Sequence, residues 1–141
     1  METIVADIAI VQALKRSETV ETLVEHRIFN TMRPEDDEKE DKIPYIVVTY
    51  EGMTNDNETK DSIEGNEDVE RVNVLIVAKD RVQLANIVNA ARTAIREYLG
   101  GDAFAKYGIA DYSVSASAVL GDWIVPCTYQ SLNYTIYTNI D

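Results

Sequence analysis

The side chains that could do chemistry in this chain are few and far apart in sequence. His26 is the only histidine and Cys127 is the only cysteine, so the chain holds no cluster with metal-ligand spacing and no internal disulfide. We expect Cys127 to be a buried thiol. Four acids between Asp56 and Glu64 could attract calcium, but the sixth-position glycine of an EF-hand loop is missing. We therefore predict no catalytic residue, no cofactor, no metal and no enzymatic activity.

The negative charge of the chain is concentrated in two segments. The formal net charge is −12 at pH 7. Residues 35–41 contain six acids and one lysine, and residues 51–70 contain eight acids and one lysine, which together account for the whole excess. We expect acidic surface loops at residues 31–43 and 51–68. Because the sequence shows no Lys/Arg patch that would replace counterions on phosphates, specific nucleic-acid binding is not expected.

Length and composition indicate a single domain over residues 1–141. A chain of 141 residues can bury a sufficient core without a metal or a disulfide. The single cysteine indicates a reducing compartment. No run is long enough to cross a membrane, and the N-terminus lacks the layout of a signal peptide. We expect a protein without membrane contact that is used or assembled inside a cell.

The most regular stretch runs from Glu70 to Leu99 and predicts a strand followed by a long helix. Apolar and polar residues alternate over residues 71–76, which is the period of a strand with one face buried. Asp80 and Gln83 have the spacing of a helix N-cap with a capping box, and the glycines at 100–101 predict a left-handed helix end. The predicted core stripe of this helix consists of Leu84, Ile87, Val88, Ala91, Ala94, Ile95, Tyr98 and Leu99.

The remaining elements complete an α+β pattern. A first helix ends near Ser17. Its predicted apolar residues are Ile4, Ile8, Val11 and Leu14, and the alanines at positions 6, 9 and 13 should allow close packing. Further strands are predicted at residues 45–50, 111–120 and 128–140, and the strands at 45–50 and 71–78 should form a wide antiparallel hairpin. The order α-β-β-α-β-β predicts a two-layer sandwich with a mainly antiparallel four-stranded sheet and its helices on one face.

The order of these segments carries a resemblance to a known family. The first helix is followed by Arg27-Ile28-Phe29, an acidic gap and then Ile43-Pro44-Tyr45-Ile46-Val47-Val48. The alternating strand Arg71 to Val77 leads directly into the long helix and a closing strand pair. Over most of its length the chain resembles the small tail-completion, or tail-terminator, proteins of long-tailed phages and prophages. The resemblance implies a structural protein that forms a ring, commonly a hexamer, on the end of the tail tube. Such a ring stops tube polymerisation and offers a docking surface to the head-side connector.

The resemblance also implies roles for particular residues. A ring around a DNA conduit should not hold DNA, and acidic loops that face its lumen would repel phosphates at short range. We therefore expect Asp56, Glu58 and Asp61 near the lumen or the tube-facing surface. Tyrosine offers a large contact area with a polar tip, and we expect Tyr134 and Tyr137 in the subunit contacts. The implied partners are further copies of the chain, the tail tube protein and the head–tail connector protein. The implied location is the virion tail, after assembly in the host cytoplasm.

Two other functions stay open at this point. A small regulatory or ligand-binding α+β domain, kept soluble by its acidic loops, would have a concave apolar pocket and form a small closed oligomer. Another phage neck component, such as a head-completion protein, would share the small size and the ring assembly.

Overall fold

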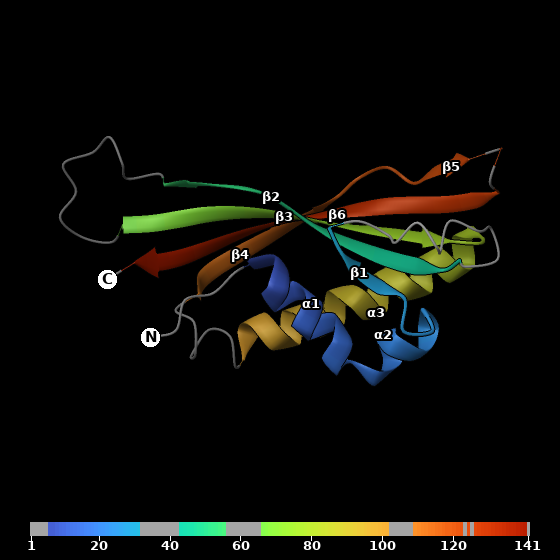
Figure 1. Cartoon of the computed structure of the whole chain (residues 1–141), viewed down its shortest axis with the longest axis horizontal. Coiled ribbons are helices and arrows are strands. Elements are labelled where there is room, and N and C mark those ends of the chain that lie inside the picture. Colours follow the sequence, from blue (N-terminus) through green and yellow to red (C-terminus); the bar gives the residue numbers. More distant parts are fainter. Residues whose placement is uncertain are drawn as a thin grey trace.

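Six strands form one sheet, and the three helices of the described chain cover one of its faces (Figure 1). The computed structural model describes residues 6–31, 43–55, 66–101, 109–122, 124 and 126–140. In chain order the elements are α1 (Ala6–Arg16), α2 (Glu18–Leu23), β1 (Ile28–Asn30), β2 (Tyr45–Asn55), β3 (Asn66–Ala78), α3 (Arg81–Gly100), β4 (Ile109–Ala116), β5 (Leu120–Asp122) and β6 (Cys127–Ile140). The predicted α+β class and mostly antiparallel sheet are confirmed. The predicted four-stranded sheet is wrong, because the short strands β1 and β5 also join it.

The strands lie in the order β1-β2-β3-β6-β4, and β5 also pairs with β6. β3 pairs antiparallel with β2 and with β6, which confirms the predicted wide hairpin. β1 runs parallel to β2. β4 pairs with residues 132–138 of β6 and β5 pairs with residues 127–129. The segment predicted as one strand at 111–120 is therefore two short strands on the same side of β6, interrupted at residues 117–119.

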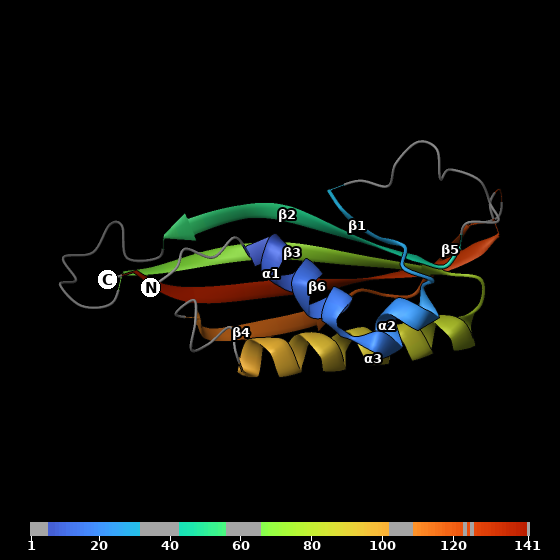
Figure 2. The same ribbon diagram turned by 60° about the horizontal axis from the view of Figure 1, so that its bottom comes forward.

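The central strands extend further into the acidic region than predicted. β2 continues to Asn55 and β3 begins at Asn66, so both ends of the predicted loop at 51–68 belong to strands. The pairing of β2 with β3 shifts register between Tyr50 and Gly52, and Gly52 has a φ of +121°. Beyond this shift, residues 51–55, 66–70 and 136–140 form an extension of the sheet that we call the arm, and the start of β4 also pairs with its residues 136–138. Figures 1 and 2 show the arm projecting past the ends of the helices.

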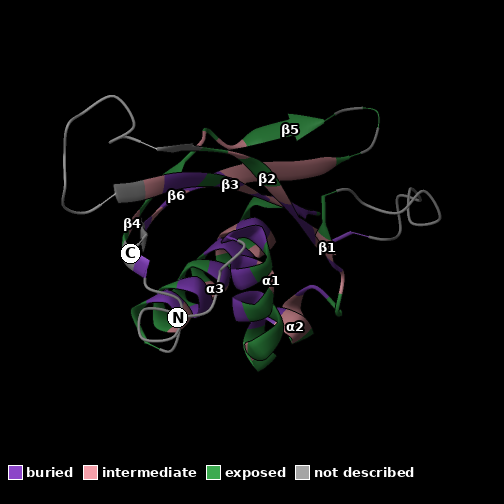
Figure 3. Ribbon diagram, turned by 60° about the vertical axis from the view of Figure 1, so that its left-hand side comes forward, coloured by how far each residue is buried: buried purple, intermediate pink, exposed green. Residues whose placement is uncertain are grey.

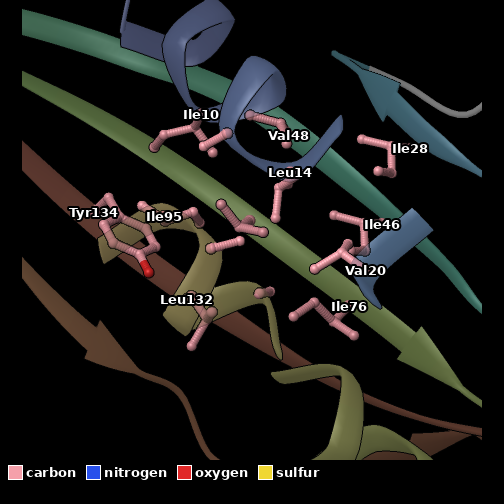
Figure 4. Packing of buried hydrophobic residues seen from close by; sticks show 14 of the residues in the cluster. Ile10, Leu14, Val20, Ile28, Ile46, Val48, Ile76, Ile95, Leu132 and Tyr134 are labelled. Atoms are coloured by element: carbon pink, nitrogen blue, oxygen red, sulfur yellow. The ribbon is translucent and has the colours of Figure 1, made fainter. Parts of the chain in front are cut away.

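The hydrophobic core fills the space between the helices and the inner face of the sheet. On β3 the inner face consists of Val72, Val74, Ile76 and Ala78, and the buried side of each helix in Figure 3 is turned toward these strands. Figure 4 shows Ile95 of α3 close to Tyr134 and Leu132 of β6. The core stripe predicted for α3 is buried except at Tyr98, which is half-buried and donates its hydroxyl hydrogen bond to Gln12 Oε1 at 2.9 Å.

The ends of α3 match the prediction at the start of the helix and differ from it at the end. The Asp80 carboxylate accepts a hydrogen bond from the backbone N–H of Gln83 at 2.8 Å, as an N-cap should. Gln83 Oε1 accepts from the N–H of Lys79 at 2.8 Å, so the side chain reaches one residue before the cap. At the C-terminus Gly101 has a φ of −115°. The left-handed conformation predicted for this glycine is therefore wrong.

The first helix buries a different face from the predicted one. Ile8 is 45% exposed and Val11 is only half-buried, while Ile4 lies outside the described residues. The buried face consists of Ala6, Ala9, Ile10, Ala13 and Leu14. All three alanines predicted to allow close packing are buried, and their small size lets α1 lie close to the sheet and α3. The predicted break is confirmed, because α1 ends at Arg16 and the Ser17 hydroxyl caps α2 by accepting from Val20 N.

Candidate assembly surfaces

The sheet face opposite the helices carries no helix in the described part of the chain (Figure 2). A polar row crosses its middle, where Asn73 Nδ2 donates to Asn133 Oδ1 across the strands at 2.9 Å. Toward β1 the same face becomes apolar and aromatic, with the rings of Phe29 and Tyr45 centred 6.3 Å apart. This face thus has an aromatic area beside an area of hydrogen-bonding side chains. Surfaces that contact other proteins are typically of this mixed kind.

The two tyrosines predicted to make subunit contacts lie on opposite faces of β6. Tyr137 is half-buried on the open face, where it is paired with Val69. Tyr134 is 2% exposed on the inner face, and its ring centre lies 6.2 Å from that of Tyr112. Burial raises the pKa of Tyr134 above its usual value, with a further increase from Tyr112 and an opposing effect of Arg92. Only Tyr137 presents its side chain to the open face, and the contact roles of both tyrosines stay predictions.

The acids predicted near a lumen, Asp56, Glu58 and Asp61, lie outside the described residues. The structure describes the strands on either side of them. Glu51 is exposed at the start of the arm, and Asp68 lies half-buried where β3 is paired with β6. The arm is therefore acidic where the structure describes it, and the lumen assignment stays a prediction.

The sheet has open edges on both sides among the described residues. On one side, β1 pairs only with residues 46–48 of β2. On the other side, β4 pairs with β6 and no described strand pairs with its outer edge. Asp111 is the only charged side chain of β4, and the strand contains no proline or lysine that would block pairing. Unpaired strand edges of this kind are available to another chain.

A groove of about 290 Å³ lies between α3 and the edge of the sheet. We call it the α3–β4 groove, and its lining residues are Asn89, Arg92, Thr93, Arg96, Tyr112, Val114 and Tyr134. Arg92 and Arg96 are both exposed one helical turn apart, and neither forms a salt bridge within the described residues. This groove is consequently a positively charged site on a strongly acidic protein.

A buried acidic cluster lies where the arm meets α1. Glu70 of β3 is 7% exposed, and its Oε1 accepts a hydrogen bond from the Tyr50 hydroxyl at 3.1 Å. Burial raises the pKa of the Glu70 carboxyl, the Tyr50 hydrogen bond opposes this shift, and Asp68 and Asp7 add to it. Asp7 is 8% exposed, and its buried Oδ1 has no hydrogen-bond partner among the described residues. The base of the arm and the first helix therefore bring carboxyls of like charge together, since the charge of Asp7 raises the pKa of Glu70.

The two residues considered first for chemistry lie apart from each other. His26 has a largely exposed side chain that contacts Glu21, in a turn where His26 itself has a φ of 65°. Cys127 is half-buried rather than fully buried, and burial together with Asp122 raises its pKa. Among the residues that the structure describes, no group of three or more His, Cys, Asp and Glu side chains could hold a metal ion.

The hydropathy of the helices gives one further observation. None of the helices in the described segments is both long and apolar enough to pass through a membrane.

Comparison with known proteins identifies the family of the chain. The sequence profile described as "Tail completion protein gp17" matches residues 8–114, well over half of the 141 residues. The chain belongs to the tail completion protein gp17 family. This member is therefore a structural protein of the tail or neck of a phage or phage-like particle. The matched region starts in α1 and ends in β4, so it includes the whole of α3 and the central hairpin.

A solved structure supports the fold of this tail completion family member. A chain from a structure entitled "Virion of native gene transfer agent (GTA) particle" matches with a TM-score of 0.64 at 14% sequence identity. The match covers 95% of this chain and 94% of that chain, so the two share a fold over almost their full lengths. No curated protein sequence matches the chain significantly.

Sequence reasoning did not find the α3–β4 groove or the buried carboxyls. The signal for the groove was the i, i+4 spacing of Arg92 and Arg96 outside the apolar stripe of α3. That spacing places two positive charges side by side on α3. They line a groove only because β4 and β6 pack beside the helix. The signal for Glu70 was its place in the alternation of β3, two residues before the buried Val72.

Proposed function

We propose that the protein caps the phage tail tube as a ring of its own copies, commonly six. The ring ends polymerisation of the tube and provides the surface to which the head-side connector joins. The proposal rests on the sheet of this tail completion family member. In the described residues, helices cover one face of the sheet, and the other face and both edges are open. Its partners would be other copies of the chain, the tail tube protein and the connector protein. Its place would be the virion tail, after assembly in the host cytoplasm, and it would catalyse no reaction.

The distribution of surfaces fits a ring better than a symmetric dimer. A ring needs heterologous contacts, in which two different patches of one subunit meet the opposite patches of its neighbours. The β2 edge and the β4 edge lie on opposite sides of the sheet, so each subunit has two different sides to offer. The excess negative charge of the chain suits a ring that DNA passes through, because acidic side chains in a lumen repel phosphates.

The first test is the oligomeric state, measured by native mass spectrometry over a range of protein concentrations with negative-stain images of the same samples. The proposal expects a ring of about six subunits with a central hole. Purified tail tubes are added in parallel, because a subunit that is monomeric alone can still close into a ring on its tube. The expected images then show capped tubes that no longer elongate.

Other results of the same experiment would contradict the capping function. A dimer that retains the mass of a small molecule, with tube ends left bare, would favour the regulatory or ligand-binding domain. Rings that bind head-side particles and leave tubes uncapped would favour a head-completion component.

A further inference from the structure

Three side chains that line the α3–β4 groove have polar groups without a partner in the described part of the chain. Arg92 and Arg96 are exposed and form no salt bridge there. Tyr134 is 2% exposed, yet it lines the groove, and its hydroxyl forms no hydrogen bond with a described residue. The groove therefore presents two charged donors and one hydroxyl to an acceptor from outside the subunit.

The arrangement of these donors suits a carboxylate. Arg92 and Arg96 are four residues apart on α3, where like charges repel each other. A carboxylate between them would relieve this repulsion, and a guanidinium group can donate two parallel hydrogen bonds to it. Arg92 is close enough to Tyr134 for its charge to oppose the rise in the pKa of that hydroxyl. A volume of about 290 Å³ has room for an acidic side chain but is small for a cofactor.

The outer edge of β4 lies beside the same groove. No described strand pairs with this edge, and Tyr112 and Val114 of β4 line the groove. An extended segment that pairs with the edge would continue the sheet at a spacing of about 4.8 Å, with every second side chain on the helix side. Such side chains would lie above the outer surface of α3, which carries Arg92 and Arg96. One segment can therefore satisfy both the backbone of β4 and the donors of the groove.

We propose that the β4 edge and the α3–β4 groove together bind an extended acidic segment of another virion protein. The segment adds a strand beside β4, and the carboxylate of one of its Asp or Glu side chains accepts hydrogen bonds from Arg92, Arg96 and Tyr134. This inference rests on the proposed function, because it gives the chemistry of a partner in the tail or neck. The open sheet face and the β1 edge remain for contacts between copies of the chain.

The outermost strands of a second copy lack the carboxylate that the groove needs. β1 consists of Ile28–Asn30 and contains no acid. β4 contains Asp111, but Tyr112 and Val114 line the groove, so the alternation places Asp111 on the opposite face of the sheet. Pairing with β1 or β4 of a second copy would leave both arginines without a counter-charge. A segment of a different protein is therefore the favoured occupant.

Nucleic acid is also a poor occupant of this groove. Tight binding to a phosphate backbone requires several basic side chains that replace counterions, and the groove offers two arginines on a chain with a net charge of −12. Repulsion by the rest of the protein acts on a whole strand of phosphates, whereas a single carboxylate meets mainly its neighbours in the groove.

The test measures binding of a short fluorescent peptide to the full-length protein. Threonine and valine alternate in this peptide, and one central valine is replaced by glutamate; a matched peptide has glutamine instead. Fluorescence anisotropy should show that the wild type binds the glutamate peptide at least about tenfold more tightly than the glutamine peptide. Arg92→Gln with Arg96→Gln should abolish this preference, and Tyr134→Phe should weaken glutamate-peptide binding by about twofold to tenfold.

A matched control and a second measurement locate the bound peptide. Arg81 is an exposed arginine of α3 outside the groove, so Arg81→Gln should keep the preference for glutamate. Circular dichroism checks that every variant is folded. Hydrogen exchange with mass spectrometry should show slower amide exchange in residues 109–116 when the peptide is bound, because their outward backbone groups become paired. Exchange in residues 28–30 should not change.

Several outcomes would overturn the proposal. Equal binding of the two peptides by the wild type, or a preference that persists in the double arginine variant, would show that the groove does not read a carboxylate. Slower exchange in β1 and not in β4 would place the peptide at the wrong edge. Displacement of the peptide by short duplex DNA or by inorganic phosphate at physiological salt would assign the groove to phosphates. Loss of self-association in the double arginine variant, without any peptide binding by the wild type, would assign it to a second copy.

Peptide binding and tube capping can fail separately. Wild-type protein that binds the glutamate peptide at β4 but leaves tail tubes uncapped would contradict the capping function and keep the groove assignment. Wild-type protein that caps tubes but does not distinguish the two peptides would contradict only the groove assignment.

Discussion

At the scale of single residues, the buried carboxyl of Glu70 gives a pH-dependent prediction. Burial raises the pKa of the Glu70 carboxyl in the folded state. The carboxyl therefore contributes fully to the free energy of unfolding below its pKa in the unfolded chain, and this contribution is lost as the pH rises through its pKa in the folded protein. Near pH 8 the wild type therefore keeps a desolvated charge. Glu70→Gln removes this charge and keeps an acceptor for the Tyr50 hydroxyl. We expect it to raise the free energy of unfolding by up to about 1 kcal/mol at pH 8, after allowing for solvent screening.

Urea unfolding of both proteins between pH 4 and pH 8 measures this difference. The advantage of the variant should shrink toward pH 4, because the wild-type carboxyl becomes increasingly protonated in the folded state as the pH falls. Glu97→Gln, at an exposed position of α3, serves as the matched control for the loss of one carboxylate. An advantage for Glu70→Gln that stays constant over this range would show that its titration is not the cause.

Gly52 gives a prediction about backbone conformation. It lies at the register shift of β2 with a φ of +121°, and a Cβ added there would meet no atom within 4 Å. Gly52→Ala should therefore destabilise the fold through backbone strain alone, by about 1–2 kcal/mol. Gly100→Ala is the control, since it also has open space but lies in α3. Because alanine is the better helix former, this control should stabilise the fold by about 0.5–1 kcal/mol. Thermal unfolding of both variants measures the contrast, and equal effects would contradict this account.

Single residues also show where prediction from sequence reached its limit. Tyr134 and Tyr137 are three residues apart in a strand, so the two-residue alternation places their side chains on opposite faces. The pattern alone gives this opposition, but it does not say which face the helices cover. That assignment depends on Leu132 and Ile136 packing against α3, which is a contact between distant parts of the chain.

At the scale of elements, α3 is the part of the fold that its own sequence specifies most fully. Its capping residues, its length and its apolar stripe are all local signals, and the structure reproduces them except at the final glycine. The sequence predicts β1 only as an extended segment near residues 27–29 and does not predict β5, because three-residue strands carry too few residues for a periodic signal and depend on their partners β2 and β6. The strand ends of the arm were missed because their acidic residues have low strand propensity, and pairing with β6 outweighs it.

The central role of α3 can be tested by placing a charge on its buried face. Ile95 is fully buried beneath the sheet, so Ile95→Asp should unfold the domain, because burying an unpaired carboxylate costs several kcal/mol. Val82 is 72% exposed in the first turn of the same helix, and Val82→Asp should be tolerated there. Circular dichroism and thermal melts distinguish the two. A stable, soluble Ile95→Asp protein would mean that the described packing of α3 is wrong.

At the scale of the whole molecule, the acidic segment 56–65 of the sequence, between β2 and β3, gives a functional prediction. Replacing Asp56, Glu58 and Asp61 with alanine should leave the thermal stability unchanged, because the described core does not include them. If these acids face the lumen, the variant should hold DNA more strongly and lower infectivity or alter tail length. The same change at Asp36, Asp37 and Glu38 is the matched control in the other acidic segment. Wild-type infectivity and tail length in the variant at residues 56, 58 and 61 would contradict the lumen assignment.

The sequence could predict the layers of this molecule but not its assembly. Alternation and capping specify the main strands and the long helix, because these depend on neighbours within a few residues, and the order of the elements indicates the two layers. The groove, the arm and the opposite edges arise from contacts between β4, α3 and the central hairpin, which lie far apart in the sequence.

The open edge of β4 also has a consequence for the subunit before it is incorporated. This strand of eight residues has one charged side chain, Asp111, and no proline or lysine, so its backbone can template any extended peptide. Newly made protein that waits for a tail is therefore exposed to off-pathway strand pairing, and concentrated stocks should slowly form fibrils. Timely consumption by assembly would protect the cell from this aggregate, and synthesis matched to the number of tails would limit how much free subunit accumulates.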